Sequence, residues 1–303
     1  MTDICALPCL FGLPRADRAV LLSNGHINET YDVHTDKGRF ILQSVNTRVF
    51  KDIGRLSENT ERAVRATDGC DDLCVPRYIS VSGSIFVRSD GNVWRMCPYI
   101  HSERPTSAYD TGHAFGAFMR RVGMEEPFVC TIDRFHDTRS YYERLRCSGT
   151  EPVFLSADDM CFDGIPKRNI HGDAKQDNCI AGEPCAVIDL DTLMTHYAAY
   201  DYGDMVRSVC RDGLSGLCDL TAGFARGLGG ILSEAEIQSL YKGIICVTGE
   251  LAMRYMLAAG GREDLGKAPA QCLERAESLV SQLDMFRRNE RYIRECIDNY
   301  FRK

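Results

Sequence analysis

The alternation of apolar and polar positions predicts that the first third of the chain is built from strands. Residues 31–35 and 39–45 alternate in the manner of half-buried β-strands, and the turn signal Asp36-Lys37-Gly38 separates them. This arrangement predicts a β-hairpin. Further short strands are predicted at residues 75–79, 84–88 and 93–100, and a polar helix at residues 57–67.

The spacing becomes helical in the rest of the chain. Residues 107–122 carry apolar side chains at helical spacing, and Gly112 and Gly116 would permit close packing. A second helix is predicted at 141–146, short strands at 170–180 and 186–190, and helices from Thr221 to the end, with a capping box at 233–236. The predicted fold class is α+β. Residues 1–98 form a β-rich N-terminal lobe, and residues 99–303 form a mainly helical C-terminal lobe after a hinge near residues 97–101.

Composition excludes several classes of protein. The chain has 303 residues, 44% hydrophobic and 26% charged, which excludes disordered and fibrous proteins. The net charge of −7 gives no basic footprint for nucleic acid. No apolar run approaches the roughly 20 residues that span a bilayer, and the N-terminus does not resemble a signal peptide. We therefore expect a cytoplasmic protein that binds neither nucleic acid nor membrane.

The chain contains fifteen cysteines, an odd number with scattered spacing and no C-x-x-C pair. A zinc site needs two close couples of Cys or His, so this pattern disfavours one. We expect most of the cysteines to be reduced residues of the core.

The most informative motif lies at His171-Gly-Asp173, with Asn178 five residues after the aspartate and Asp189 after a short apolar run. The spacing H-x-D-x-x-x-x-N is that of a kinase catalytic loop. Phosphoryl transfer to a hydroxyl requires a carboxylate that orients the attacking oxygen and accepts its proton, and Asp173 suits this role. Asn178 and Asp189 supply the oxygen ligands that Mg²⁺ prefers to share with phosphates. The motif predicts an ATP- and Mg²⁺-dependent phosphotransferase; the alternative is a polar turn with solvated carboxylates.

Neighbouring polar residues have supporting roles. His171 is expected to buttress the loop through backbone hydrogen bonds. Asp201 and Asp204 either cap the segment that follows the metal site or hold the catalytic loop, and capping is the first expectation. Lys175 either touches phosphate or faces solvent, and the role of Asp191 stays open.

The catalytic motif resembles that of the aminoglycoside phosphotransferase and choline kinase group, relatives of the protein kinases. Within that group the chain is similar to the N-acetylhexosamine 1-kinases, which use ATP to phosphorylate the anomeric hydroxyl of an N-acetylhexosamine. This closer similarity is carried by Gly25-His-Ile-Asn-Glu-Thr-Tyr31, Phe40 to Thr47, Ala114 to Phe118, Phe135-His-Asp-Thr138, Ile188 to Thr192 and Asp201-Tyr-Gly-Asp204. The resemblance implies a two-lobed protein-kinase-like fold and a sugar acceptor.

The resemblance also implies roles for individual residues. It makes Asp173 the catalytic base, in contact with the acceptor, and Asn178 and Asp189 the magnesium ligands. The nucleotide would meet Asn24 and Gly25 at its phosphates, Gln43 at the strand position where most kinases carry a lysine, Glu61 as the helix glutamate, and the hinge residues Cys97 and Tyr99. His26 and Arg254 would contact the substrate.

The chain departs from that family in two places. After Arg254 the family continues with a segment containing Tyr and Asp, but here the chain reads Met256-Leu-Ala-Ala-Gly-Gly-Arg262. The region between residues 138 and 171 is also shorter. Both changes affect the part that shapes the acceptor pocket, so the sequence leaves open a same-fold kinase of an aminoglycoside, choline or homoserine. An inactive nucleotide-binding regulatory module is a further alternative. The oligomeric state is not indicated.

Overall fold

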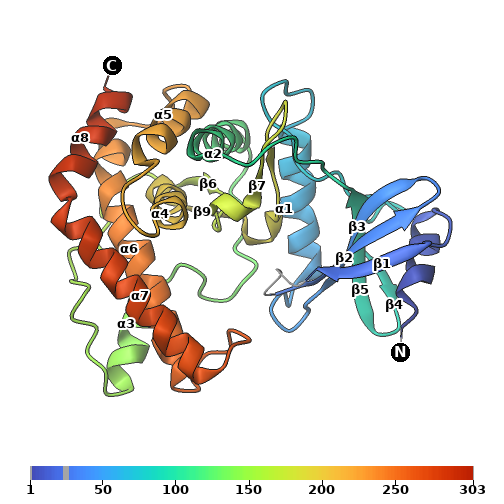
Figure 1. Cartoon of the computed structure of the whole chain (residues 1–303), viewed down its shortest axis with the longest axis horizontal. Helices are drawn as coiled ribbons and strands as arrows, with labels where there is room; N and C mark the ends of the chain where they lie inside the picture. Colours follow the sequence, from blue (N-terminus) through green and yellow to red (C-terminus); the bar gives the residue numbers. More distant parts are fainter. Residues whose placement is uncertain (1, 23–26, 303) are drawn as a thin grey trace.

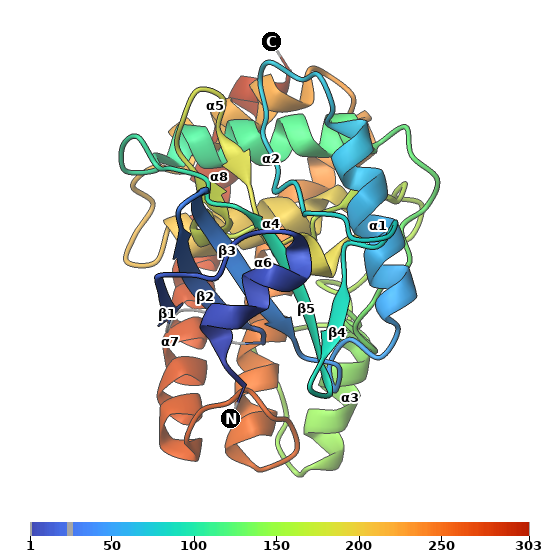
Figure 2. The same ribbon diagram turned by 90° about the vertical axis from the view of Figure 1, so that its right-hand side faces the viewer.

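The N-terminal part of the chain forms a five-stranded antiparallel sheet. In the computed structural model, which describes residues 2–22 and 27–302, the strand order is β1-β2-β3-β5-β4 (Figures 1 and 2). The strands are β1 (Arg18–Leu22), β2 (Glu29–Thr35), β3 (Gly38–Val45), β4 (Val87–Ser89) and β5 (Asn92–Pro98). The short 3₁₀ helix η1 (Ile4–Phe11) packs on one face of this sheet through Leu7 and Phe11, which share a buried cluster with Leu42 and Met96.

The predicted hairpin is confirmed, whereas the strand predicted at residues 75–79 is wrong. β2 and β3 pair around the turn, with Thr35 opposite Gly38. In the 75–79 segment, by contrast, the structure gives only a single backbone bond from Ile79 N to Met96 O, 2.7 Å long. Pro76 interrupts the run, and a proline has no N–H to contribute to a ladder. The side chain of Val75 is nevertheless buried, in the core of the helical lobe.

Helix α1 (Ile53–Ala66) lies between the sheet and the other helices (Figure 1). The side chain of Asp52 caps it by accepting a hydrogen bond from Arg55 N. Leu56 packs toward the sheet, while Ala63 belongs to the core of the helical lobe. The buried amide of Asn59 donates to Val129 O at 2.8 Å and to Leu193 O at 3.3 Å. α1 therefore connects the two lobes through apolar packing and through side-chain hydrogen bonds.

The C-terminal part is mainly helical. Its helices are α2 (Ala108–Val122), α3 (Thr138–Cys147), α4 (Ala198–Val209), α5 (Leu217–Leu228), α6 (Glu234–Ala259), α7 (Pro269–Arg288) and α8 (Glu290–Phe301). Between α3 and α4 lie the short strands β6 (Arg168–Ile170), β7 (Cys179–Ile180), β8 (Ala186–Val187) and β9 (Met194–His196), with the 3₁₀ helices η2 (Gln176–Asn178) and η3 (Leu190–Thr192). β6 pairs with β9, and β7 pairs with β8.

Close helix contacts depend on small residues. A Cβ atom on Gly112 of α2 would lie 2.0 Å from Leu220 O of α5, and one on Gly243 of α6 would lie 2.0 Å from Ala199 O of α4. These separations are too short for any side chain, which confirms the close packing predicted for Gly112. The predicted capping box at Ser233 and Glu236 is also present at the start of α6.

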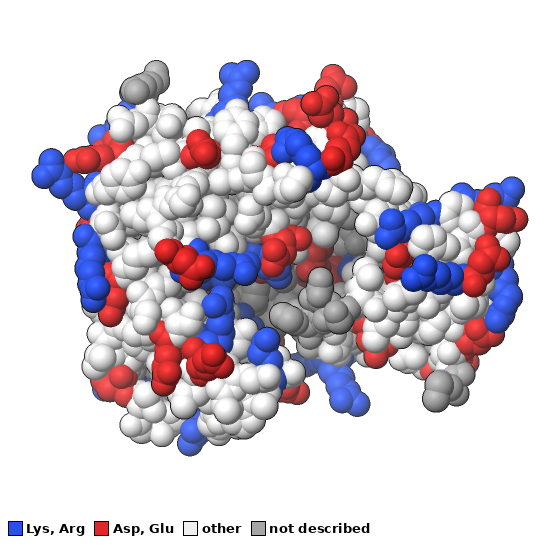
Figure 3. Space-filling view, viewed as in Figure 1, with Lys and Arg blue, Asp and Glu red and all other residues white. Residues whose placement is uncertain are grey.

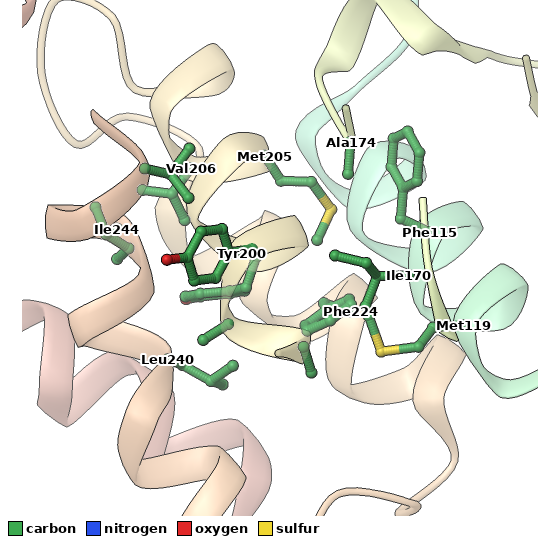
Figure 4. Close-up of a cluster of buried hydrophobic side chains, with 14 of the residues drawn as sticks. Phe115, Met119, Ile170, Ala174, Tyr200, Met205, Val206, Phe224, Leu240 and Ile244 are labelled. Carbon is green, nitrogen blue, oxygen red and sulfur yellow. The ribbon is translucent and has the colours of Figure 1, made fainter. Parts of the chain in front are cut away.

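The main core fills the space between these helices. Figure 4 shows Phe115 and Met119 of α2, Ile170 of β6, Tyr200 and Met205 of α4, Phe224 of α5 and Leu240 of α6 directed into one cluster. β6, which leads into the predicted catalytic loop, is therefore anchored in the most buried part of the lobe.

The cysteines are less buried than predicted. All fifteen are free thiols, but only six are buried, because many occupy loops and helix surfaces. Within the described part of the chain, none of the helices is both long and apolar enough to cross a bilayer. The α+β class and its two-lobed arrangement agree with the sequence-based prediction.

Candidate active site

The backbone of the loop after β6 is held by a carboxylate from α4. Asp201 accepts hydrogen bonds from His171 N and Gly172 N, each 2.8 Å long. Gly172 has φ +82°, and a Cβ there would lie 2.4 Å from Thr192 O, so only glycine fits. Asp201 therefore holds the predicted catalytic loop and does not cap α4. Capping, the first expectation, was wrong because the α4 N-cap lies four residues earlier, at Tyr197.

His171 has the structural role predicted for it. Its Nε2 lies 3.0 Å from Ile188 O, and its Nδ1 lies 3.3 Å from the N–H of Asp173. The ring makes edge contacts with Phe115 and Phe118. Because Nδ1 accepts a hydrogen bond from the N–H of Asp173, the ring proton is on Nε2, which donates a hydrogen bond to Ile188 O.

Asp173 has one occupied oxygen and one open oxygen. Lys175 Nζ donates to Oδ2 at 2.6 Å, and Asn178 Nδ2 donates to the same oxygen at 3.0 Å. The described part of the chain provides no partner for Oδ1. Burial raises the pKa of Asp173, but the charge and hydrogen bond of Lys175 outweigh it, and the net pKa lies below the usual value. The carboxylate is thus ionised and has a free oxygen for an incoming hydroxyl.

Asp189 follows β8 in a left-handed conformation, with φ 63° and ψ 60°. Burial, together with the nearby Asp191 and Asp173 carboxylates, raises its pKa to about 7. Lys175 and Arg95 already pair with Asp173 and Asp191, which leaves Asp189 as the carboxylate without a cationic side-chain partner among the described residues. The NH₂ group of Asn178 donates hydrogen bonds to Asp173, so the amide oxygen of Asn178 takes no part in that contact.

This donor set fits Mg²⁺, a hard cation that takes one or two carboxylate or amide oxygens and completes its coordination with substrate phosphates and water. No group of three or more His, Cys, Asp or Glu side chains arranged for a metal ion occurs among residues 2–22 and 27–302. A site built from Asp189 and Asn178 therefore needs oxygens from a bound nucleotide.

Asp191, whose role was open, pairs with an arginine that the sequence analysis did not identify. Arg95 of β5 donates to Oδ1 of Asp191 through Nη1, and to Oδ2 through Nη2 at 2.8 Å. Both side chains are almost fully buried, with exposed fractions of 0% and 2%. Arg95 Nε also donates to Gln43 Oε1 at 2.8 Å, and Asn28 Nδ2 donates to Asp191 Oδ2 at 2.7 Å. Gln43 is thereby fixed at the inter-lobe junction.

The other residues predicted to bind the nucleotide are spread along the N-terminal lobe. Glu61 accepts from Ser57 Oγ at 2.6 Å and lies 3.9 Å from Arg65, and these contacts do not connect it with Gln43. Cys97 is buried in β5, and Tyr99 follows that strand with Arg39 3.5 Å above its ring. Asn24, Gly25 and His26 lie outside the described residues.

Arg254 lies on α6, with its guanidinium 5.5 Å from the ring centre of Phe135 and 5.6 Å from that of Tyr141. Its Nε is buried and has no hydrogen-bond partner within the described residues. Glu250, one turn earlier on α6, is buried and paired with His136. Neither Glu250 nor His136 was assigned a role from the sequence.

Figure 3 shows a hollow between the two lobes, with acidic and basic side chains on its rim. A separate pocket of about 250 Å³ in the helical lobe is lined by Phe135, His136, Thr138, Phe162, His196 and Tyr200, among others. His136 belongs to this lining and also contacts the catalytic loop, so the pocket adjoins the site.

One sequence signal could have identified Arg95. It stands in the apolar run Val93-Trp94-Arg95-Met96-Cys97, and a charge in the centre of such a strand requires a buried partner. The sequence does not indicate which carboxylate that partner is. The same holds for Glu250, which sits within the apolar part of α6.

The model of the family described as "Phosphotransferase enzyme family" matches residues 18–235 of this chain. That range contains both the sheet and the catalytic loop.

Solved structures with the same fold include an aminoglycoside phosphotransferase from Alicyclobacillus acidocaldarius, with TM-score 0.63, 10% identity, and coverage of 94% of this chain and 93% of the other. A microcompartment-associated aminopropanol kinase has TM-score 0.63 and 14% identity over 94% and 96% of the two chains. A spectinomycin phosphotransferase in complex with ADP and spectinomycin has TM-score 0.60 and 12% identity over 91% and 94%. At such low identity the likeness concerns the fold, a protein-kinase-like arrangement of two lobes.

Proposed function

Because the chain belongs to the phosphotransferase enzyme family, we propose that it transfers the γ-phosphoryl group of ATP to the anomeric hydroxyl of an N-acetylhexosamine or a related sugar. The products are a sugar 1-phosphate and ADP. The observation that carries the transfer reaction is the open Oδ1 of an ionised Asp173 beside the Asn178 and Asp189 oxygens.

In this reaction Asp173 orients the acceptor hydroxyl through Oδ1 and accepts its proton as the new O–P bond forms. Lys175 and Asn178 keep the carboxylate in place through Oδ2. Asp189 and Asn178 would hold Mg²⁺, which neutralises charge on the phosphates when it is bound. The proposed transfer is direct, from ATP to the acceptor hydroxyl, with Asp173 as the base.

The sugar acceptor is supported by the family segments in the sequence and by the position of Arg254. The partly exposed Arg254 side chain places its guanidinium, a charged hydrogen-bond donor, beside the rings of Phe135 and Tyr141. A sugar has hydroxyl groups that can accept hydrogen bonds from Arg254, and C–H faces that can pack against the aromatic rings. Fold relatives named as aminopropanol kinase and spectinomycin phosphotransferase act on other alcohols, so these acceptors define the competing outcome.

The test is an ADP-release screen over N-acetylglucosamine, N-acetylgalactosamine, other hexoses, aminoglycosides, choline, homoserine and aminopropanol. We expect the strongest signal from a reducing sugar and a product that no longer reduces. Asp173→Asn is expected to lower kcat by about 10²–10⁴-fold. The matched control is Lys167→Met. Lys167 is a surface lysine that lies above the ring of Tyr197, and its replacement should leave turnover unchanged.

The outcomes separate the assignments. A product phosphorylated away from the anomeric carbon, or a preference for an amino alcohol, would reject the sugar 1-kinase and keep the phosphotransferase. Equal activity of Asp173→Asn and wild type would show that Asp173 is not the catalytic base. A thermal shift with ATP and Mg²⁺ but no turnover on any acceptor would favour a regulatory module.

A further inference from the structure

His136 joins two parts of the active site that are far apart in the sequence. It precedes α3, and its ring is buried between the catalytic loop and α6. Nε2 lies 2.7 Å from the carbonyl oxygen of Gly172, the residue before Asp173. Nδ1 lies 3.1 Å from Oε1 of Glu250. A single imidazole therefore contacts both the catalytic loop and the helix that carries Arg254.

Both of these contacts are with acceptors. A backbone carbonyl oxygen cannot donate, and an ionised carboxylate cannot donate. Glu250 accepts from the Thr138 hydroxyl through its other oxygen, Oε2, so both of its oxygens act as acceptors, and although burial raises its pKa the net value lies below the usual one. Two donated hydrogen bonds require a proton on each ring nitrogen, so His136 is an imidazolium.

The groups around the ring support this protonation state. The titratable and charged side chains that act on His136 or its partner are Glu250 and Arg254 of α6, Asp204 and Tyr200 of α4, and His196 of β9. Burial lowers the pKa of His136, but the Glu250 carboxylate and then Asp204 raise it to a net value above the usual one. His196 stays neutral, because burial and the His136 charge lower its pKa to about 3.

We propose that His136 is a positioning residue for phosphoryl transfer, which as an imidazolium fixes the backbone that presents Asp173 to the acceptor-side helix α6. This inference rests on the proposed function, since it takes Asp173 as the base. Arg254 lies four residues after Glu250, on the same face of α6. Contact of an acceptor with Arg254 is thus linked to the catalytic loop through Glu250 and His136.

The proposal predicts that kcat decreases on the alkaline side of the pH profile. The imidazolium is present below the raised pKa of His136 and is lost as the pH rises through it. The neutral ring can still donate one hydrogen bond, but the nitrogen facing the other acceptor then carries no proton. We expect kcat to fall at a pH above about 6.5, the ordinary histidine value.

Glu250→Gln separates charge from geometry. The amide NH₂ can donate to an unprotonated Nδ1, while Nε2–H continues to donate to Gly172 O. Both hydrogen bonds are kept with a neutral ring, so the alkaline fall due to His136 should disappear. His136→Gln removes the bridge and should lower kcat about 10²-fold with little change in the KM for ATP. The neighbouring His196→Gln should keep the wild-type pH profile.

The direct readout is the ¹⁵N spectrum of histidine-labelled protein, which needs no acceptor. We expect both nitrogens of His136 to be protonated at pH 7 in wild type and only one in Glu250→Gln. A wild-type ring with one bare nitrogen at pH 7, or an alkaline limb unchanged by Glu250→Gln, would overturn the proposal. Discovery of a different acceptor would overturn the sugar assignment alone, since the profiles can be recorded with that acceptor.

Discussion

Arg95 and Asp191, 96 residues apart in the sequence, form a buried bidentate ion pair between β5 and the turn that follows Asp189. Arg95 also holds Gln43, and Asp191 also accepts from Asn28, so four side chains form one polar network. The network connects the sheet directly with the segment that carries a proposed magnesium ligand.

Arg95→Ala is expected to lower the free energy of unfolding by about 3–5 kcal/mol, because it leaves the Asp191 carboxylate buried without its counter-charge. Replacing both residues together, as Arg95→Met with Asp191→Leu, should restore much of this stability. Urea denaturation measures both values. Arg15→Ala, which breaks an exposed pair with Asp3, is the control and should have no measurable effect. An equally small effect of Arg95→Ala would contradict the buried pair.

Lys175→Met is expected to raise the pKa of Asp173. Lys175 is the main group that lowers this pKa against burial, so its removal leaves burial dominant. The acid form of Asp173 cannot accept a proton, and the acidic limb of kcat/KM should therefore move to higher pH. Profiles recorded at saturating Mg²⁺ check this. Lys167→Met should leave the limb in place, and coincident limbs for all three proteins would refute the role of Lys175.

Oxidation should join α5 to α8. Cys218 Sγ lies 3.2 Å from Cys296 Sγ, close enough to form a bond after a small movement. Hydrogen peroxide converts one thiol to a sulfenic acid, which the other thiol attacks with release of water. Peptide mapping after mild treatment should detect a Cys218–Cys296 cross-link. Cys218→Ser should abolish it, whereas Cys147→Ser, at an exposed thiol, should not.

Gly243→Ala should destabilise the protein by several kcal/mol, a magnitude typical of strongly overpacked positions. The added methyl group would lie 2.0 Å from Ala199 O, a backbone atom of α4 that cannot yield alone. Gly54→Ala is the matched control, because its nearest neighbour is a flexible Asp52 oxygen at 3.3 Å. Thermal unfolding should show a much lower Tm for the first variant only.

Local signals accounted for what the sequence could predict. The β2–β3 turn, the capping box at Ser233 and the spacing from Asp173 to Asn178 depend on residues within a few positions of one another. The strand expected at residues 75–79 does not form, because Pro76 interrupts the run and Val75 packs into the core of the helical lobe, whereas Ile79 packs against the sheet.

Contacts between distant segments could not be predicted in the same way. The partners of Arg95, Asn59 and His136 lie 96, 134 and 114 residues away, and no periodic pattern encodes such pairings. Asp201 illustrates the limit. An aspartate close to a glycine favoured capping, and only the packing of α4 against β6 turns its carboxylate to the loop.

The Arg95–Asp191 pair has a consequence for how spent nucleotide leaves. A wide separation of the two lobes would break the pair between the Arg95 guanidinium and the Asp191 carboxylate. Both charged groups would then have to be hydrated. We therefore expect ADP to leave without a wide separation of the two lobes.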